Sequence, residues 1–318
     1  MGGGVPRCGR GRTSAFLGRQ PRGRPEVPLT DKLKSLLGGA GGKLNVKSRF
    51  ELLREAMSGT MSKVYMARDR SDDRIVALKL LDPEKTAFFE GRFKGLKKPP
   101  EGEIAVRFDH PNIVKTYEHG LTTDGCQYLV MEYLRGSGLN TVLARRDGSL
   151  DGRRVGLIRQ AAAGLQAVHE AGFIHRDVCP RNYLFSDDGE TLKLTDFGLT
   201  IPAEEPFLRP GNRTGTPNYM APEVVRRRTT NKTVDVFAFG VTIYELCTGE
   251  LPWMSGDTGQ AAMTHDTPPT PITKYRPQIS PALAEAIHSC LIADPAKRCP
   301  SLEEFLKSIE GIESEDVS

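Results

Sequence analysis

Three polar residues, His175-Arg176-Asp177, follow the apolar pair Phe173-Ile174, and Asn182 comes five residues after the aspartate. A carboxylate and a carboxamide at this spacing, on a turn that contains a proline, suit two chemical tasks. Asp177 could accept a proton from a hydroxyl group, and Asn182 could hold a metal ion bound to phosphate groups. Polar residues also follow many ordinary strands, so the prediction depends on partner residues elsewhere in the chain.

Residues 74–81 supply one such partner. The segment predicts a strand in which Lys79 points away from Leu78 and Leu80. A lysine on an otherwise apolar strand needs a partner or a ligand, unless it reaches solvent from the strand end.

Several segments, in this order, resemble the eukaryotic-type protein kinase family in its serine/threonine branch. The resemblance covers about residues 50–310, and its main motifs are Val76-Ala77-Leu78-Lys79, His110–Val114, His175–Asp177, Asp196-Phe197-Gly198 and Gly215–Glu223. A bacterial source would fit the compact single-domain chain. The resemblance implies transfer of the γ-phosphate of ATP, with Mg²⁺, to protein substrates.

The implied fold is α+β with two lobes, a small β-rich N-lobe and a large helical C-lobe. We expect the N-lobe and hinge at residues 49–134, the C-lobe at residues 135–310 and an acidic C-terminal end at residues 311–318. Residues 1–48 read as a basic, largely disordered tail with a short helix near residues 29–37.

The resemblance gives each candidate catalytic residue a role. Asp177 would orient the substrate hydroxyl and take its proton, while Asn182 and Asp196 would hold Mg²⁺. Lys79 would bind phosphate oxygens and pair with a glutamate of a short helix, either Glu101 or Glu103.

Helical spacing favours Glu101 in this pair. Ile104, Ala105 and Phe108 follow Glu101 at positions that form one apolar stripe, whereas Arg107 follows Glu103 by one turn. Gly102 makes the helix short, and a mobile helix would allow an inactive state.

The nucleotide pocket is also assigned by the resemblance. Val64, Ala77 and Leu184 would enclose the adenine ring, Met131 would lie behind it, and the backbones of Glu132 and Leu134 would bind its edge. The family has three glycines over the phosphates, and the corresponding residues here are Met57, Gly59 and Ser62. We expect Met57 to crowd the turn and to weaken nucleotide binding without abolishing it.

The catalytic loop departs from the serine/threonine pattern at one position. Cys179 stands where a lysine usually reaches the γ-phosphate, and Arg181 lies where tyrosine kinases place an arginine for this task. Arg181 is therefore the predicted γ-phosphate cation. Cys179 is expected to be an inert filler, although neighbouring cations could lower its pKa.

Supporting roles follow from the same resemblance. Asp235 would hold the catalytic loop backbone, and Glu223 would pair with Arg298. Arg176 indicates regulation by phosphorylation, since an arginine there can pair with a phosphate group. The usual acceptor position is occupied by Asn212, which has no hydroxyl group, so Thr214, the nearest residue with a hydroxyl, is the predicted phosphorylation site. Autophosphorylation is thus an expectation.

Composition sets outer bounds. Residues 1–48 carry a net charge of +8, so the remainder of the +4 chain carries −4. This basic tail could touch nucleic acid or anionic lipid, but Phe16 is its single aromatic residue, so we expect a solvated arm and no nucleic-acid partner. The chain contains no apolar run long enough for a membrane span, and its six scattered cysteines indicate reduced thiols, so a cytoplasmic protein is expected.

Three functions remain open: an active serine/threonine kinase, a pseudokinase that binds nucleotide without turnover, and a small-molecule kinase. Residues 215–223 resemble the family's peptide-binding segment, which small-molecule kinases generally lack, so the resemblance disfavours the third. Met57, Ser62 and Cys179 motivate the second. The active enzyme is the preferred interpretation because all five catalytic positions are filled.

Overall fold

The computed structural model describes Met1 and residues 43–59, 61–211, 213–253 and 263–316. The predicted helix near residues 29–37, most of the predicted tail and Asn212 lie outside the described residues. The described chain from residue 43 onward belongs to one compact unit.

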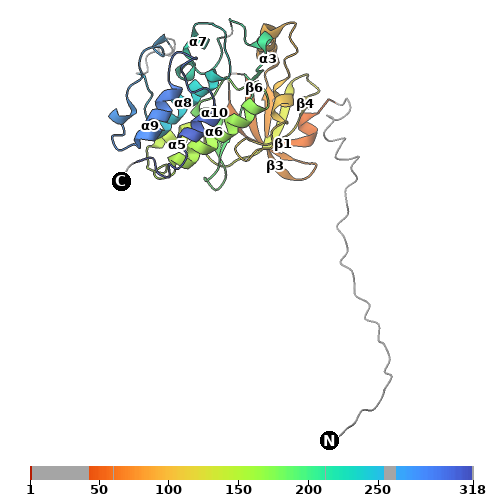
Figure 1. Cartoon of the computed structure of the whole chain (residues 1–318). Helices are drawn as coiled ribbons and strands as arrows, with labels where there is room; N and C mark the ends of the chain where they lie inside the picture. The colour runs from red at the N-terminus through yellow and green to blue at the C-terminus, as the bar shows by residue number, and fades with distance from the viewer. Residues whose placement is uncertain (2–42, 60, 212, 254–262, 317–318) are drawn as a thin grey trace. The chain divides into compact units, whose positions relative to one another are not determined.

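A five-stranded antiparallel sheet forms the first part of this unit, with strand order β1-β2-β3-β5-β4 (Figure 1). The strands are β1 (Phe50–Ser58), β2 (Ser62–Asp69), β3 (Arg74–Leu81), β4 (Thr116–Leu121) and β5 (Gln127–Glu132). Strand β3 has a neighbour on each side, so its middle residues are buried. Lys79 lies in this buried stretch, opposite Val64 on β2 and Leu129 on β5.

Short helices accompany the sheet: α2 (Val46–Arg49), α3 (Pro83–Glu90) and α4 (Glu101–Ala105). Helix α3 begins at Pro83, and the preceding Asp82 side chain accepts hydrogen bonds from two backbone amides of the first turn. The chain then leaves the α-helical conformation through a 3-10 turn at Gly91–Phe93, and α4 begins only after Pro100. The predicted short helix at Glu101 is confirmed.

The second part of the unit is mainly helical (Figure 1). Its helices are α5 (Leu139–Arg145), α6 (Arg154–Glu170), α7 (Pro222–Val225), α8 (Thr233–Thr248), α9 (Pro281–Cys290) and α10 (Leu302–Ser308). Helix α8 is buried along almost its whole length, so it forms the centre of this part. The predicted two-lobed α+β architecture is confirmed.

Small strand pairs position the loops between α6 and α8. They are β6 (Phe173–Ile174) with β9 (Ile201–Pro202), and β7 (Tyr183–Phe185) with β8 (Leu192–Leu194). Because each pair is antiparallel, the segment at 175–182 and the segment at 195–200 leave the strands side by side.

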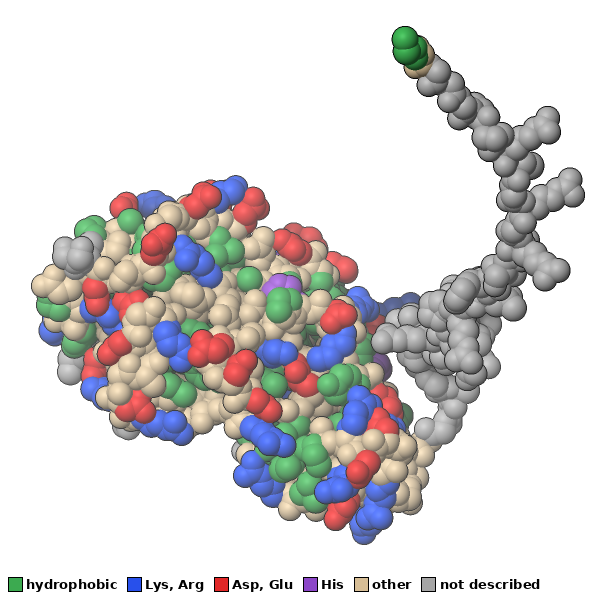
Figure 2. Space-filling view, turned by 90° about the horizontal axis from the view of Figure 1, so that it is seen from below, with side chains coloured by type: hydrophobic (Ala, Val, Ile, Leu, Met, Phe, Trp, Pro, Cys, Tyr) green, Lys and Arg blue, Asp and Glu red, His purple; other side chains and the backbone are tan. Residues whose placement is uncertain are grey.

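The end of the described chain is packed rather than free. Glu315 is 2% exposed and forms ion pairs with Arg154 (3.0 Å) and Arg276 (3.4 Å). On the face shown in Figure 2, the basic and acidic side chains of the described residues are interspersed.

Candidate functional site

Lys79 is the centre of the first half of the site. Its Nζ lies 2.5 Å from Glu101 Oε1 and 2.8 Å from Asp196 Oδ1. Glu103 instead pairs with Arg107, and both of these side chains are about half exposed. The interpretation that Glu101, rather than Glu103, pairs with Lys79 is confirmed.

The charges of this triad depend on one another. Burial alone would lower the pKa of Lys79, but the Asp196 and Glu101 carboxylates outweigh it and raise that pKa. Burial raises the pKa of the Glu101 carboxyl. Burial also opposes ionisation of Asp196, but Lys79 and the Gly198 amide prevail and lower the pKa of Asp196.

Asp235, on α8, fixes the catalytic loop backbone. Its carboxylate accepts hydrogen bonds from the amides of His175 (2.7 Å) and Arg176 (2.8 Å), and it lies 2.9 Å from His169 Nε2. Arg176 has a left-handed backbone (φ 68°), which these two amide bonds stabilise. The predicted role of Asp235 as a backbone anchor is confirmed.

Asp177 is the centre of the second half. Asn182 donates its side-chain amide to Asp177 Oδ2 (3.0 Å), which orients the carboxylate. The hydroxyl of Thr216 donates to Asp177 Oδ1 at 2.7 Å and accepts a hydrogen bond from Arg181 Nη2 at 3.0 Å. A threonine hydroxyl thus lies between the carboxylate and the guanidinium, in the geometry that an acceptor hydroxyl would need.

Cys179 is fully buried behind this arrangement. Burial, together with the neighbouring Asp177 charge, raises the pKa of its thiol to about 11. The suggestion that nearby cations lower this pKa is wrong, because Arg181 has a smaller effect than burial. A small inert filler is the interpretation that the burial supports.

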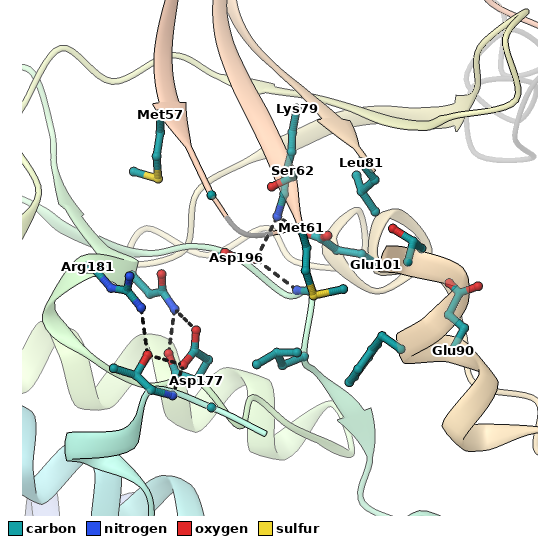
Figure 3. Close-up of a pocket in the computed structure, with 18 of the residues that line it drawn as sticks. Met57, Met61, Ser62, Lys79, Leu81, Glu90, Glu101, Asp177, Arg181 and Asp196 are labelled. Atoms are coloured by element: carbon teal, nitrogen blue, oxygen red, sulfur yellow. Dashed lines mark hydrogen bonds and ion pairs between the residues drawn. The ribbon is translucent and has the colours of Figure 1, made fainter. Parts of the chain in front are cut away.

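Two adjoining cavities meet at these residues. One, of about 380 Å³, is lined by all nine residues predicted to contact a nucleotide: Met57, Gly59, Val64, Ala77, Lys79, Met131, Glu132, Leu134 and Leu184. The other, of about 530 Å³, contains the catalytic groups: Lys79, Glu101, Asp177, Arg181, Asn182, Asp196 and Thr216. Figure 3 shows Lys79 reaching from β3 toward Asp196 and Glu101, with Asp177 and Arg181 across the same cavity.

The turn over the cavities accommodates its unusual residues. Met57 pairs with Val64 across β1 and β2 and is 49% exposed, so it extends the strand instead of crowding the turn. The Gly59 amide donates to the Ser62 carbonyl (2.9 Å). A Cβ on Gly59 would meet only an ordinary contact at 3.4 Å, so the fold itself does not require glycine there.

Asn182 and Asp196 fit a shared Mg²⁺ site only in part. No cluster of three or more His, Cys, Asp or Glu side chains suited to a metal lies among the described residues. An amide and a carboxylate can still serve Mg²⁺ when phosphate and water supply the other oxygens. Both residues border both cavities, so phosphates could complete the ligand set there.

Part of the larger cavity was not predicted from the sequence. Thr86, Phe89 and Glu90 on α3, together with Lys98, line its outer wall. These residues belong to no motif, and only the break between α3 and α4 brings them to the site.

The supporting ion pair of the second lobe is also present. Arg298 Nη1 lies 2.7 Å from Glu223 Oε1, and Nη2 lies 3.0 Å from Glu223 Oε2.

The side-chain oxygen of Thr214 is buried and has no hydrogen-bond partner among the described residues, so its modification would require the segment to open. Among the described residues, none of the helices has the length and apolar character needed to cross a bilayer.

Comparison with known proteins gives one family. The family model described as "Protein kinase domain" matches residues 50–308. Serine/threonine-protein kinase pkn3 of Myxococcus xanthus is 35% identical over 273 residues, which cover 81% of this chain and 48% of that protein. PknA of Mycobacterium tuberculosis is 32% identical (85% and 62% covered), and PrkC of Bacillus subtilis is 29% identical (83% and 40%). The chain spans about half the length of the curated relatives it matches.

Proposed function

Because the chain belongs to the protein kinase family, with bacterial serine/threonine-protein kinases as relatives, we propose that it transfers the γ-phosphate of ATP to serine or threonine hydroxyls of proteins. The observation that carries the proposal is the Thr216 hydroxyl, held between Asp177 (2.7 Å) and Arg181 (3.0 Å). This arrangement supports the proposal, because the loop holds an alcohol against a carboxylate and a cation at the same time.

Each group has a defined task in the proposed reaction. Asp177 orients the incoming hydroxyl and takes its proton as the oxygen attacks phosphorus. Arg181 stabilises the charge that develops on the transferred phosphoryl group, in place of the lysine that Cys179 replaces. Lys79, held by Glu101, binds the phosphates of ATP.

Asn182 and Asp196 would hold Mg²⁺, which supplies charge neutralisation on the phosphates when bound. The Lys79–Asp196 ion pair keeps the Asp196 carboxylate ionised before the metal arrives, since Lys79 lowers its pKa. The adenine ring would occupy the smaller cavity between Val64, Ala77 and Leu184.

The competing proposal is a pseudokinase that binds nucleotide without useful turnover. The replacement of two loop glycines by Met57 and Ser62, and the presence of Cys179, motivate it. The Lys79–Glu101 pair favours the active enzyme instead, as does the presence of Asn182 and Asp196 in the linings of both cavities.

One experiment separates the two proposals. The protein is incubated with labelled ATP, Mg²⁺ and a generic basic protein, and transfer is compared between wild type and Asp177→Asn. We expect transfer by the wild type and loss of nearly all transfer in the variant. Nucleotide binding without transfer by either protein would replace the kinase proposal with the pseudokinase one.

Autophosphorylation is part of the proposal, with Thr214 as the site. Thr214 and Arg176 line one small pocket, where a phosphate would lie near a guanidinium. Mass spectrometry after incubation with ATP tests this, and an active enzyme with unmodified Thr214 would exclude the site.

A further inference from the structure

The loop between α9 and α10 (Figure 1) follows directly after Cys290 and contains a second cysteine, Cys299. Cys290 is the last residue of α9 and is fully buried, while Cys299 is partly exposed. The amide of Cys299 donates to the Ser289 carbonyl at 3.1 Å, so the chain returns to the end of α9. This backbone bond places Cys299 beside Cys290, and the Cys299 thiol itself donates to the Ser301 carbonyl at 3.3 Å.

The two thiols differ in how readily they lose a proton. Interaction with the neighbouring Cys290 side chain lowers the pKa of the Cys299 thiol to about 7, although burial and the Glu304 charge oppose it. A large fraction of Cys299 is therefore thiolate near neutral pH, which is the reactive form. Burial raises the pKa of Cys179 to about 11 and of Cys247 to about 12, so these thiols remain protonated.

The loop closed by the two cysteines contains Arg298. Besides Glu223, this guanidinium donates to the carbonyls of Ile292 (2.8 Å), Ala293 (3.0 Å) and Thr233 (2.8 Å). Two of these carbonyls belong to the loop itself, so the conformation of the loop and the position of Arg298 are coupled. A covalent bond between the two ends of the loop would therefore also restrain Arg298 and its ion pair with Glu223.

We propose that Cys290 and Cys299 form a reversible disulfide in the presence of hydrogen peroxide, and that this bond holds the Arg298 loop in its native conformation. The proposal goes beyond the kinase activity and does not depend on it. The Ser289–Cys299 backbone bond of 3.1 Å already holds the two ends of the loop together, with Cys290 next to Ser289 in the chain. Bond formation therefore requires little backbone movement.

The chemistry balances with peroxide as the only oxidant. The Cys299 thiolate attacks one peroxide oxygen, the O–O bond breaks, and hydroxide leaves and is protonated to water. The Cys290 sulfur then attacks the resulting sulfenic sulfur, and its thiol proton leaves with the displaced hydroxide as a second water. Two thiols lose two electrons, and one peroxide is reduced to two waters.

The test uses the full chain without ATP. Wild type is treated with hydrogen peroxide, free thiols are alkylated, and tryptic peptides are mapped by mass spectrometry. We expect a linked pair of peptides containing Cys290 and Cys299 that separates on addition of dithiothreitol. Oxidised wild type without this linked pair, or with sulfinic acid at Cys299 and alkylated Cys290, would overturn the proposal.

Variants assign the roles. Cys299→Ser should form no linked pair, and Cys290→Ser should stop at a sulfenic acid on Cys299 that dimedone labels. Cys126→Ser is the matched control and should form the link as wild type does. Because Cys290 is in the core, circular dichroism checks the fold of Cys290→Ser. The wild-type map and Cys299→Ser decide the matter if that variant is unfolded.

The effect on the loop has its own readout. Closing a loop of this length should raise the melting temperature of oxidised wild type by about 5 °C, and the rise should be absent in Cys299→Ser. A disulfide that forms without a rise would contradict the proposed stabilisation of the Arg298 loop.

Discussion

The two lobes each contain a buried pair of glutamate and cation, and the pairs differ in what surrounds the cation. Glu101 and Glu223 are both 5% exposed. Arg298 has a fully buried side chain and donates only to protein atoms: both oxygens of Glu223 and three carbonyls. Lys79 shares its ammonium between Glu101 and Asp196, and the Asp196 side chain is 44% exposed at the cavity.

The difference separates a structural pair from a functional one. A guanidinium whose donors are occupied by fixed protein acceptors cannot exchange a partner for a ligand. An ammonium that contacts one carboxylate at the cavity can exchange that contact for a phosphate oxygen. The signs of the charges and the burial are alike in the two pairs, so the access of the cation to the cavity is the property that decides whether it can bind a ligand.

Removal of Arg298 should have the largest effect on stability. Arg298→Ala leaves the Glu223 carboxylate buried without its partner, and we expect the free energy of unfolding to fall by about 3–5 kcal/mol. Urea denaturation measures this. A loss under about 1 kcal/mol would show that the pair is not a structural anchor.

The corresponding change at Lys79 should separate activity from stability. Lys79→Ala should lower turnover by about a thousandfold, since a phosphate-binding cation is lost. The unfolding free energy should fall by less than in Arg298→Ala, because Glu101, whose pKa burial already raises, can become protonated. Denaturation of the two variants side by side checks this, and an equal loss of stability would remove the distinction.

Arg181 tests the second cation of the cavity. Arg181→Ala, with Cys179 unchanged, should reduce turnover about a hundredfold with little change in stability, because its side chain is exposed. Steady-state phosphoryl transfer is the measurement. Arg135→Ala is the matched control, since Arg135 is exposed and lines the nucleotide cavity, and it should retain most activity. Turnover that survives loss of Arg181 would exclude it as the replacement for the loop lysine.

Gly102 tests how α4 holds Glu101 in place. A Cβ on Gly102 would lie 2.4 Å from His119 Cβ on β4, so the close approach of helix and strand requires glycine. Helix propensity alone predicts that Gly102→Ala stabilises α4 by about 1 kcal/mol. We expect the opposite, a loss of about 1–3 kcal/mol and about tenfold in turnover, as α4 moves away and separates Glu101 from Lys79.

Two variants serve as controls for this prediction. Gly102→Ala with His119→Gly should recover most of the activity, because the second change removes the His119 Cβ that the new methyl group would meet. Gly91→Ala should be neutral or slightly stabilising, since nothing lies within 4 Å of a Cβ there. A stabilised, fully active Gly102→Ala would show that the helix tolerates the shift.

Site residues that belong to short sequence motifs could be predicted. Residues that come together only through the packing of distant segments could not. Lys79, Asp177 and Asp196 stand in short motifs, and the helical stripe after Glu101 distinguished it from Glu103. The cavity wall at Thr86 and Lys98 depends on where a helix stops and resumes, which no local pattern gave. The contact of Cys290 with Cys299 depends on the path of a loop, and scattered cysteines carry no sequence signal for it.

The smallest expected effect concerns a third ion pair. This pair is partly exposed, so it is neither a buried structural pair like Arg298–Glu223 nor a cavity pair like Lys79–Glu101. Arg276 donates to both oxygens of Asp316, whose side chain is 40% exposed, and these hydrogen bonds lower the pKa of Asp316. A carboxyl whose folded pKa is lowered contributes stability above its unfolded pKa, about 4, and loses it as pH falls through the folded pKa. Asp316→Asn should therefore cost about 0.5 kcal/mol at neutral pH, and the difference from wild type should shrink below about pH 4. Urea denaturation of both proteins across this range is the measurement. A loss as large as that of Arg298→Ala would mean that burial of the cation does not govern the strength of these pairs.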